Sequence, residues 1–252
     1  MDGLFSRAST YVNFPCYNNS QNERSVGFAS LAGFPQVQGA INCTHMAIRE
    51  PPEQPGAFIN CKRFCSINVQ LVCNYKKRFI QICARFPGSC HDAFILRQSN
   101  IPNLFLPGNR LKGRLVGDKG YPLQIWFMTP VRNPTNETQA CYNESHMPTR
   151  CVIEQAIGVL KMCFRCLDRS GGTLQYSPAR VSRMIVVCSA LHNIAQQQGL
   201  EVENDQGAYQ SSSDDETIEE EGEEEEEDKE QFEGGGTHSQ TSRVHCCSGC
   251  QG

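Results

Sequence analysis

Long apolar runs are missing from this chain of 252 residues. No stretch of about 18 consecutive apolar residues occurs, so we expect no membrane-spanning helix. The first residues, Met1 to Arg7, also lack the apolar core of a secretory signal peptide. These two absences, together with an odd number of 15 scattered cysteines, favour free thiols in a reducing compartment over a disulfide framework.

Acidic residues are scarce in the first 200 positions. This part holds 21 Lys and Arg against 10 Asp and Glu, a net charge of +11, whereas residues 201 to 252 hold 2 against 17, a net charge of −15. A basic folded part favours a polyanionic partner such as nucleic acid, although a merely solvated cationic surface explains such a charge equally well. We expect the acidic segment to be disordered, either as a solvating appendage or as a competitor of DNA for the basic part.

A second CxxC pair is missing from the part that we expect to fold. The single pair, Cys163 and Cys166, lies in a helical pattern, so a zinc or redox site is disfavoured. Cys246, Cys247 and Cys250 lie in the acidic segment and would bind metal only adventitiously. The basic run at residues 76–78 is typical of a hairpin turn in solvent, although a contact with the DNA backbone would use the same residue types.

The chain divides into three parts on its patterns. We expect residues 1–33 to be poorly structured, residues 34–199 to form one α/β domain, and residues 200–252 to be the disordered acidic tail. Within the first part, residues 17–22 are polar and unpatterned, which disfavours regular structure.

Strand and helix patterns alternate along the central part. The strand patterns cover a first strand that ends at Asn42, an antiparallel hairpin at 64–73 and 78–86, and an apolar run that delivers Asp118 before Gly120. The helix patterns cover a helix capped by Ser89, a long helix capped by Thr149, and a last helix at 181–198.

Three acids and one amide occupy comparable places in this layout: Asn42 and Asp118 at strand ends, Asp92 at a helix start and Glu154 on the long helix. Three strands, a helix, a strand and a later helix that bears Glu are typical of an RNase H-like mixed sheet flanked by helices. Carboxylates at these places converge on two divalent metals in phosphodiester hydrolysis. Each of the three acids could instead have a purely structural role. Asp118 could form a turn, Asp92 could cap a helix, and Glu154 could be a solvated helix residue.

Histidines near apolar runs occur at three positions of the central part, His45, His146 and His192. They could act as metal ligands or general bases, but a single histidine near an apolar run is more often a hydrogen-bonded structural residue.

Six short segments resemble the DDE-superfamily endonucleases of the PIF/Harbinger transposase type. They are residues 39–45 (GAINCTH), 87–92 (PGSCHD), 117–121 (GDKGY), 152–154 (VIE), 164–168 (FRCLD) and 191–193 (LHN). They occur in order and with natural spacing from about Phe34 to Gly199.

The resemblance implies a nuclease dependent on Mg²⁺ or Mn²⁺, with Asn42, Asp92, Asp118 and Glu154 at the metal-ligand positions and the three acids carrying catalysis. It also implies DNA as substrate, a Myb-like DNA-binding partner protein, and a location in the nucleus and also the cytoplasm. The chain departs from the family at Asn42, where the family has Asp. An amide oxygen brings no negative charge, so we expect weaker metal binding and a rate lower by roughly 10²-fold or more.

Three hypotheses for function follow. The first is a transposase-derived, metal-dependent DNA endonuclease that is impaired by Asn42. The second is a catalytically inactive, domesticated transposase that acts as a DNA- or protein-binding module. The third is a decayed chain that does not fold cooperatively, which thermal unfolding distinguishes from the other two.

Overall fold

The computed structural model describes residues 2–54, 56–106, 108–109 and 111–199. These residues lie in one compact unit, Met1–Tyr209, whereas a second unit, Gln210–Gly252, and the expected acidic tail at 200–252 lie outside the described residues. No helix in the described ranges is both long and apolar enough to cross a membrane.

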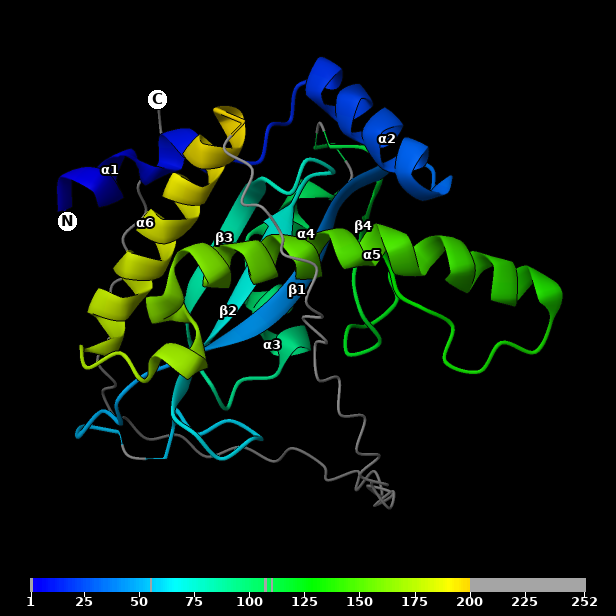
Figure 1. Cartoon of the computed structure of the whole chain (residues 1–252). Coiled ribbons are helices and arrows are strands. Elements are labelled where there is room, and N and C mark those ends of the chain that lie inside the picture. The colour runs from blue at the N-terminus through cyan, green and yellow to red at the C-terminus, as the bar shows by residue number, and fades with distance from the viewer. Residues whose placement is uncertain (1, 55, 107, 110, 200–252) are drawn as a thin grey trace, which may run out of the picture. The chain divides into compact units, whose positions relative to one another are not determined.

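A mixed sheet of five strands forms the centre of the first unit (Figure 1). The strands are β1 Val37–Ala47, β2 Ser66–Cys73, β3 Phe79–Pro87, β4 Arg114–Val116 and β5 Phe127–Met128, in the spatial order β3-β2-β1-β4-β5. The pairs β1–β2 and β2–β3 are antiparallel, whereas β1–β4 and β4–β5 are parallel. This confirms the expected α/β, RNase H-like sheet and its hairpin.

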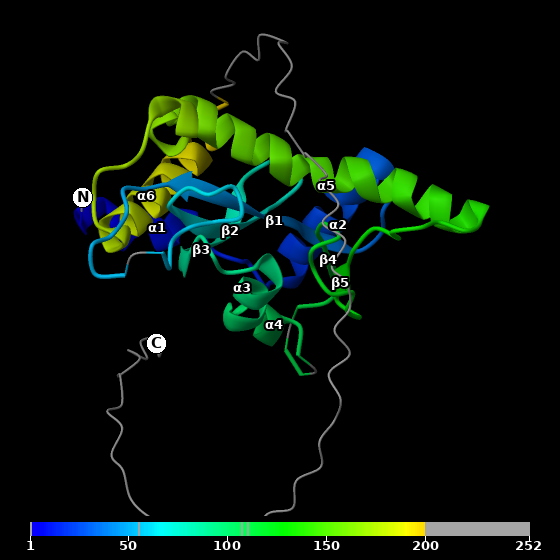
Figure 2. The same ribbon diagram turned by 90° about the horizontal axis from the view of Figure 1, so that it is seen from below.

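Helices cover both faces of the sheet. Figure 2 shows α5 (Glu137–Cys163) and α6 (Pro178–Gln197) on one side of the strands and α3 (Asp92–Gln98) and α4 (Ile101–Leu104) on the other. Two hydrophobic clusters separate in the same way, because successive side chains of a strand point to opposite faces. After α5 the chain makes two 3-10 helices, η1 (Arg165–Leu167) and η2 (Arg169–Gly171).

The N-terminal residues are helical, which corrects the expectation that residues 1–33 are poorly structured. They form α1 (Asp2–Tyr11) and α2 (Asn18–Ala32). Tertiary contacts stabilise helices that their own sequences favour only weakly. Phe28 of α2 is fully buried in the core, and the Arg24 guanidinium donates to Gln38 Oε1 of β1 at 2.9 Å.

Two expected helix caps are also wrong. The long helix α5 begins at Glu137, where Asn136 Oδ1 accepts a hydrogen bond from Gln139 N at 2.9 Å. Thr149 lies inside α5, and its hydroxyl donates to the Ser145 carbonyl at 2.8 Å, next to Pro148, which has no N–H to donate. The Ser89 hydroxyl donates to the Ala57 carbonyl instead of capping α3.

Candidate functional site

The short strand β4 covers only the beginning of β1. Their register pairs Val37 with Arg114 and Ala40 with Val116, and it ends there. The strand β1 continues to Ala47 because its ladder with β2 continues to Ser66. One side of residues 41–46 therefore has no strand beside it among the described residues, and we call this side the open edge of β1. It ends at Ala47, whose carbonyl accepts from the Leu174 N–H at 3.1 Å.

Asn42 lies on this open edge. It is in the middle of β1 and not at the end of a strand, which corrects the sequence-based expectation. If the parallel register is extended by two residues, Asn42 is level with Asp118, which follows β4. The Asn42 side-chain oxygen accepts a hydrogen bond from the Cys43 N–H at 2.9 Å.

Asp92 and Asp118 are the two acids that the fold brings together. Burial raises the pKa of the Asp92 carboxyl, a hydrogen bond from Asn68 Nδ2 at 2.9 Å opposes this rise, and the negative charge of Asp118 adds to it. Asp118 Oδ1 accepts a hydrogen bond from the Gly120 N–H at 2.9 Å, so Asp118 also has the turn-forming role.

Cys43 and Tyr121 lie next to this acidic pair, and sequence reasoning did not identify either as part of the site. The Tyr121 hydroxyl donates to Cys43 Sγ at 3.2 Å. Burial first, and then Asp92, raise the pKa of Cys43, whereas burial first, and then Cys43 and Asp92, raise the pKa of Tyr121. Both groups therefore stay protonated at neutral pH. The signal for Cys43 was strand alternation, which places it on the same face as buried Ile41.

Glu154 is held by an ion pair within its own helix. Arg150 Nη1 lies 2.7 Å from Glu154 Oε1, with the two side chains 25% and 28% exposed. His146, one turn before Arg150, lies close enough to Asp118 for that carboxylate to affect its pKa, although burial is the largest effect and lowers the pKa. Glu154 lies about two turns after His146 on the same helix, and Arg150 is its ion-pair partner.

His146 and His192 have the structural roles that we expected as the commoner alternative. Each ring lies within hydrogen-bonding distance of a backbone carbonyl, His146 Nε2 at 3.3 Å from Met128 O and His192 Nε2 at 2.9 Å from Lys77 O.

The donor atoms at the open edge suit a hard cation only in part. Asp92 and Asp118 supply two carboxylates, and the buried Oδ1 of Asn68 beside them has no hydrogen-bond partner among the described residues. Mg²⁺ is commonly held by one or two carboxylates, with water and substrate phosphate supplying the rest. In the described part of the chain, however, no group of three or more His, Cys, Asp or Glu is placed so that it could hold a metal ion. The residues present thus fit a two-carboxylate arrangement, and the four-residue ligand set stays a prediction.

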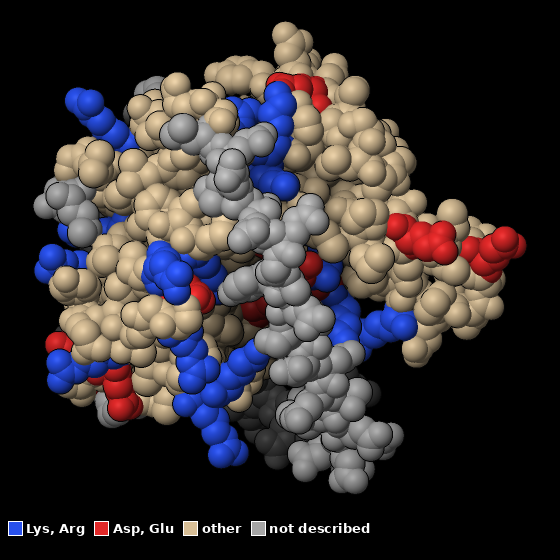
Figure 3. Space-filling model, viewed as in Figure 1, with Lys and Arg blue, Asp and Glu red and all other residues tan. Residues whose placement is uncertain are grey.

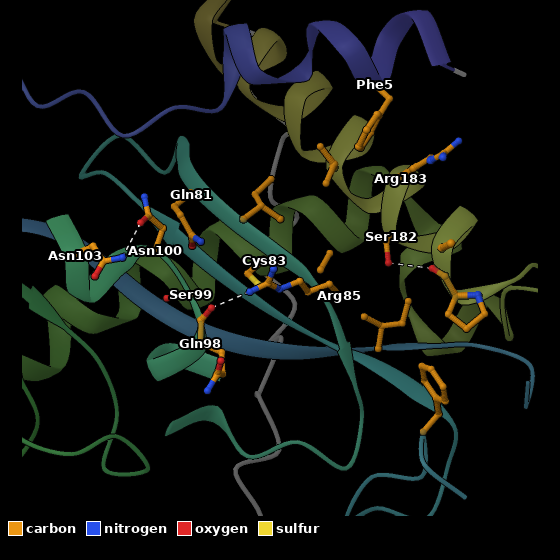
Figure 4. Close-up of a pocket in the computed structure, with 17 residues that line it drawn as sticks. Phe5, Gln81, Cys83, Arg85, Gln98, Ser99, Asn100, Asn103, Ser182 and Arg183 are labelled. Carbon is orange, nitrogen blue, oxygen red and sulfur yellow. Dashed lines mark hydrogen bonds between the residues drawn. The ribbon is translucent and has the colours of Figure 1, made fainter. Parts of the chain in front are cut away.

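Cationic side chains are numerous on the face of the molecule seen in Figure 3. Figure 3 shows Lys and Arg side chains spread over the face and gathered over its lower part, where the loop after β1 and the 3-10 helices after α5 lie. A cavity of about 840 Å³ lies elsewhere, at the outer edge of β3, lined by residues of α1, β3 and α6. Figure 4 shows Arg85 there, with its guanidinium donating to the Gln98 carbonyl. None of the four predicted ligands lines this cavity.

Known proteins share this arrangement of segments. A sequence profile of the DDE superfamily endonucleases matches residues 41–193. HARBI1 of Bos taurus and HARBI1 of Homo sapiens, both named as nucleases, are 36% identical to the chain over 201 residues, which cover 80% of this chain and 58% of each relative. An ALP1-like protein of Arabidopsis thaliana is 28% identical over 222 residues, which cover 82% of this chain and 53% of that protein. No solved structure matches.

The chain therefore belongs to the DDE superfamily endonucleases, a family that typically uses divalent metals. Within that superfamily it is homologous to HARBI1, the Harbinger transposase-derived nuclease, which confirms the resemblance noted in the sequence. The chain spans somewhat more than half the length of these relatives, 58% of HARBI1.

Proposed function

We propose that this chain is a transposase-derived DNA endonuclease that hydrolyses phosphodiester bonds with Mg²⁺ or Mn²⁺ and works at a reduced rate. The observation that carries the proposal is the pair of neighbouring acids at the open edge of β1, Asp92 and Asp118. Family membership supports nuclease chemistry, and the net charge of +11 over residues 1–200 supports DNA as the substrate.

Asp92 and Asp118 would hold the metal. When bound, a divalent metal of this kind activates water and stabilises the charge on the leaving oxygen. The Asn68 amide orients Asp92, and the Gly120 N–H orients Asp118, so both carboxylates are held before substrate arrives. A cation between them would relieve the repulsion that raises the pKa of Asp92.

Asn42 and Glu154 would limit the rate. Asn42 brings no charge, and its oxygen is engaged by the Cys43 N–H. Glu154 would complete the ligand set only when its ion pair with Arg150 opens.

A second candidate function follows from the same two residues. A chain in which Arg150 neutralises Glu154 and an amide replaces the first acid offers a metal only two carboxylates, those of Asp92 and Asp118. Such a chain would act as a catalytically inactive module that binds DNA or protein through its basic surface.

A Myb-like partner protein and a nuclear and cytoplasmic location are part of the same proposal. Both are supported by the family resemblance alone. Loss of nuclear accumulation when such a partner is depleted would test them together.

Nicking of supercoiled plasmid DNA in Mn²⁺ tests the proposed activity directly. We expect slow nicking by the wild-type chain, an increase of roughly 10²-fold in Asn42→Asp, and no nicking in Asp118→Asn. Glu144→Gln, which removes an exposed acid from α5, is the matched control and should behave as wild type.

The same assay separates the two candidates. Activity that appears only in Asn42→Asp would identify the natural chain as a binding module with an otherwise intact site. Nicking that survives Asp118→Asn would contradict the assignment of the site.

A further inference from the structure

A group of cations lies at the far end of the open edge of β1, about 10 Å along the strand from Asn42 at the usual rise per residue. It is built on the loop after β1, the end of α5 and the start of η2. We call it the basic cluster, and its members are His45, Lys62, Lys161 and Arg169.

Phe64 is the centre of the basic cluster. Its ring meets the His45 ring edge-on, with the centroids 6.3 Å apart. The Arg169 guanidinium lies over the same ring, 4.3 Å from its centroid. The positive charges of Lys62 and Lys161 both act on His45, and the charge of Lys62 also acts on Lys161.

Hydrogen bonds to Asn60 hold the loop that carries Lys62. The Asn60 carbonyl accepts from the Arg63 N–H at 2.9 Å, and its side-chain oxygen accepts from the Phe64 N–H at 3.3 Å. Arg63 has a positive φ of 60°, which is uncommon for a residue with a side chain. The loop thus presents Lys62 and Arg63, both exposed, from a fixed backbone.

The same asparagine is connected to His45 through the Ser66 hydroxyl. Asn60 Nδ2 donates to the Ser66 hydroxyl at 3.0 Å, and this hydroxyl lies 3.0 Å from His45 Nδ1. A serine hydroxyl that donates to Nδ1 leaves the His45 proton on Nε2, where the ring can donate to a ligand. Burial first, and then Lys161 and Lys62, lower the pKa of His45 to about 4, so the neutral ring offers one N–H donor at neutral pH.

The charges of the basic cluster are poorly balanced. Within the described residues, no Asp or Glu oxygen lies within 4.0 Å of a charged nitrogen of Lys62, Lys161 or Arg169. Asp168 acts on Lys161 from a longer range and offsets one of these three positive charges. Lys161 is also half-buried, and a half-buried cation without a close partner is costly.

We propose that the basic cluster binds a phosphate group of the DNA strand that crosses the acidic pair. Lysine, arginine and an imidazole N–H are donors that suit phosphate oxygens, and an anion would supply the missing negative charge. The cluster would hold the strand a short distance beyond the bond to be cut. This inference rests on the proposed DNA substrate but does not require cleavage.

Binding of a fluorescein-labelled DNA duplex to the full chain in EDTA, followed by anisotropy at several salt concentrations, tests the proposal. We expect Lys62→Gln/Lys161→Gln to bind roughly tenfold more weakly than wild type at 0.1 M salt and to lower the slope of log K against log[salt] by about one. The matched control is Arg7→Gln/Lys76→Gln, which removes two exposed cations elsewhere and should change binding less than twofold. Lys76 lies in the β2–β3 turn, at the other end of the sheet, where it pairs with Glu23.

The possible results of this binding experiment distinguish failure of the phosphate site from failure of the proposed function. Equal weakening in both double variants, or none in Lys62→Gln/Lys161→Gln, overturns the phosphate site and leaves the proposed nuclease function standing. Absence of binding by the wild-type chain overturns both. The exposed single variant Lys62→Gln keeps the test valid if the half-buried Lys161 position does not tolerate substitution, and we expect it to weaken binding about threefold.

Discussion

Asp92 and Asp118 show how the fold makes ordinary carboxyl groups reactive toward a cation. A half-buried acid beside a second acid is unfavourable as an anion, which is why the pKa of Asp92 is raised. Asn68 and Gly120 hold the two carboxylates by hydrogen bonds, so they do not relax away from each other. An exposed pair of acids would have neither property.

The burial of His45 should make the folding stability of the chain depend on pH. Its pKa is lowered to about 4 in the folded chain, against 6.5 for the ordinary side chain, so below pH 6.5 the unfolded chain binds a proton that the folded chain does not. Folding stability is therefore fully present above pH 6.5 and is lost as the pH falls toward 4. We expect His45→Gln to reduce this loss by on the order of 2 kcal/mol, after a discount for solvent screening.

Urea unfolding at pH values from 4 to 7 measures this difference. The control is Arg7→Gln, an exposed change in α1, and it should follow the wild-type pH dependence. A His45→Gln curve parallel to that of wild type would contradict the lowered pKa.

At the scale of elements, one side chain of α6, Asn193, forms hydrogen bonds with the backbone of the edge strand β3. The Asn193 amide accepts from the Phe79 N–H at 2.8 Å and donates to the Phe79 carbonyl at 2.7 Å, as a neighbouring strand would. It also donates to the Tyr11 carbonyl at 2.8 Å, which ties α1 to the same place. The third residue of the segment LHN thus has a structural role.

Asn193→Ala should destabilise the fold by roughly 2–4 kcal/mol, because it leaves buried backbone groups of Phe79 without partners. The midpoint of urea unfolding measures the loss. Gln197→Ala, an exposed change in the last turn of α6, should cost less than about 0.5 kcal/mol. Similar midpoints for the two variants would show that Asn193 is dispensable.

Two glycines should respond in opposite ways to substitution by alanine. A Cβ at Gly117 would lie 2.5 Å from the ring of fully buried Phe127, so Gly117→Ala should destabilise by roughly 1–3 kcal/mol and displace the neighbouring Asp118. A Cβ at Gly158, inside α5, meets nothing within 4 Å, so Gly158→Ala should stabilise by roughly 0.5–1 kcal/mol. Thermal unfolding of the two variants checks the signs, and two shifts in the same direction would contradict this description of the packing.

Sequence patterns predicted those helices and strands that are specified by their own residues and not by distant contacts. The β2–β3 hairpin follows from alternating apolar residues around Asn74, whose side-chain oxygen accepts from Lys76 and Arg78 at 3.0 Å. The helices α1 and α2 did not follow, because Phe28 and Arg24 are stabilised by a distant strand. The start of α5 was misplaced because Thr149 is a residue type that often caps helices and it directly precedes the apolar residues of helical spacing.

The sequence predicted only some residues of the candidate site. Motif spacing identified Asp92 and Asp118, which the fold brings together. It did not reveal that Asn42 is mid-strand or that Arg150 pairs with Glu154, since both depend on how far β4 extends and how α5 is placed. The site also contains three residues that motif spacing did not identify, Cys43, Asn68 and Tyr121. They are far apart in the sequence and come together only when β1, β2 and the loop after β4 fold.

For the molecule as a whole, the central feature is the coincidence of a basic surface with an acidic pair at one open strand edge. The basic surface can hold a DNA backbone, and the acidic pair can hold a cation that acts on it. The acidic residues 201–252 are a complication for metal binding, because their 17 carboxylates also attract cations.

The most direct measurement is therefore the increase in thermal unfolding temperature that Mn²⁺ produces in the full chain. Ions that bind the folded and unfolded chains alike leave the unfolding temperature unchanged, whereas a site at the open edge stabilises only the folded chain. We expect a small increase for wild type, a larger one for Asn42→Asp and none for Asp118→Ala. The same increase in all three proteins, or none in Asn42→Asp, would contradict a metal site at Asp92 and Asp118.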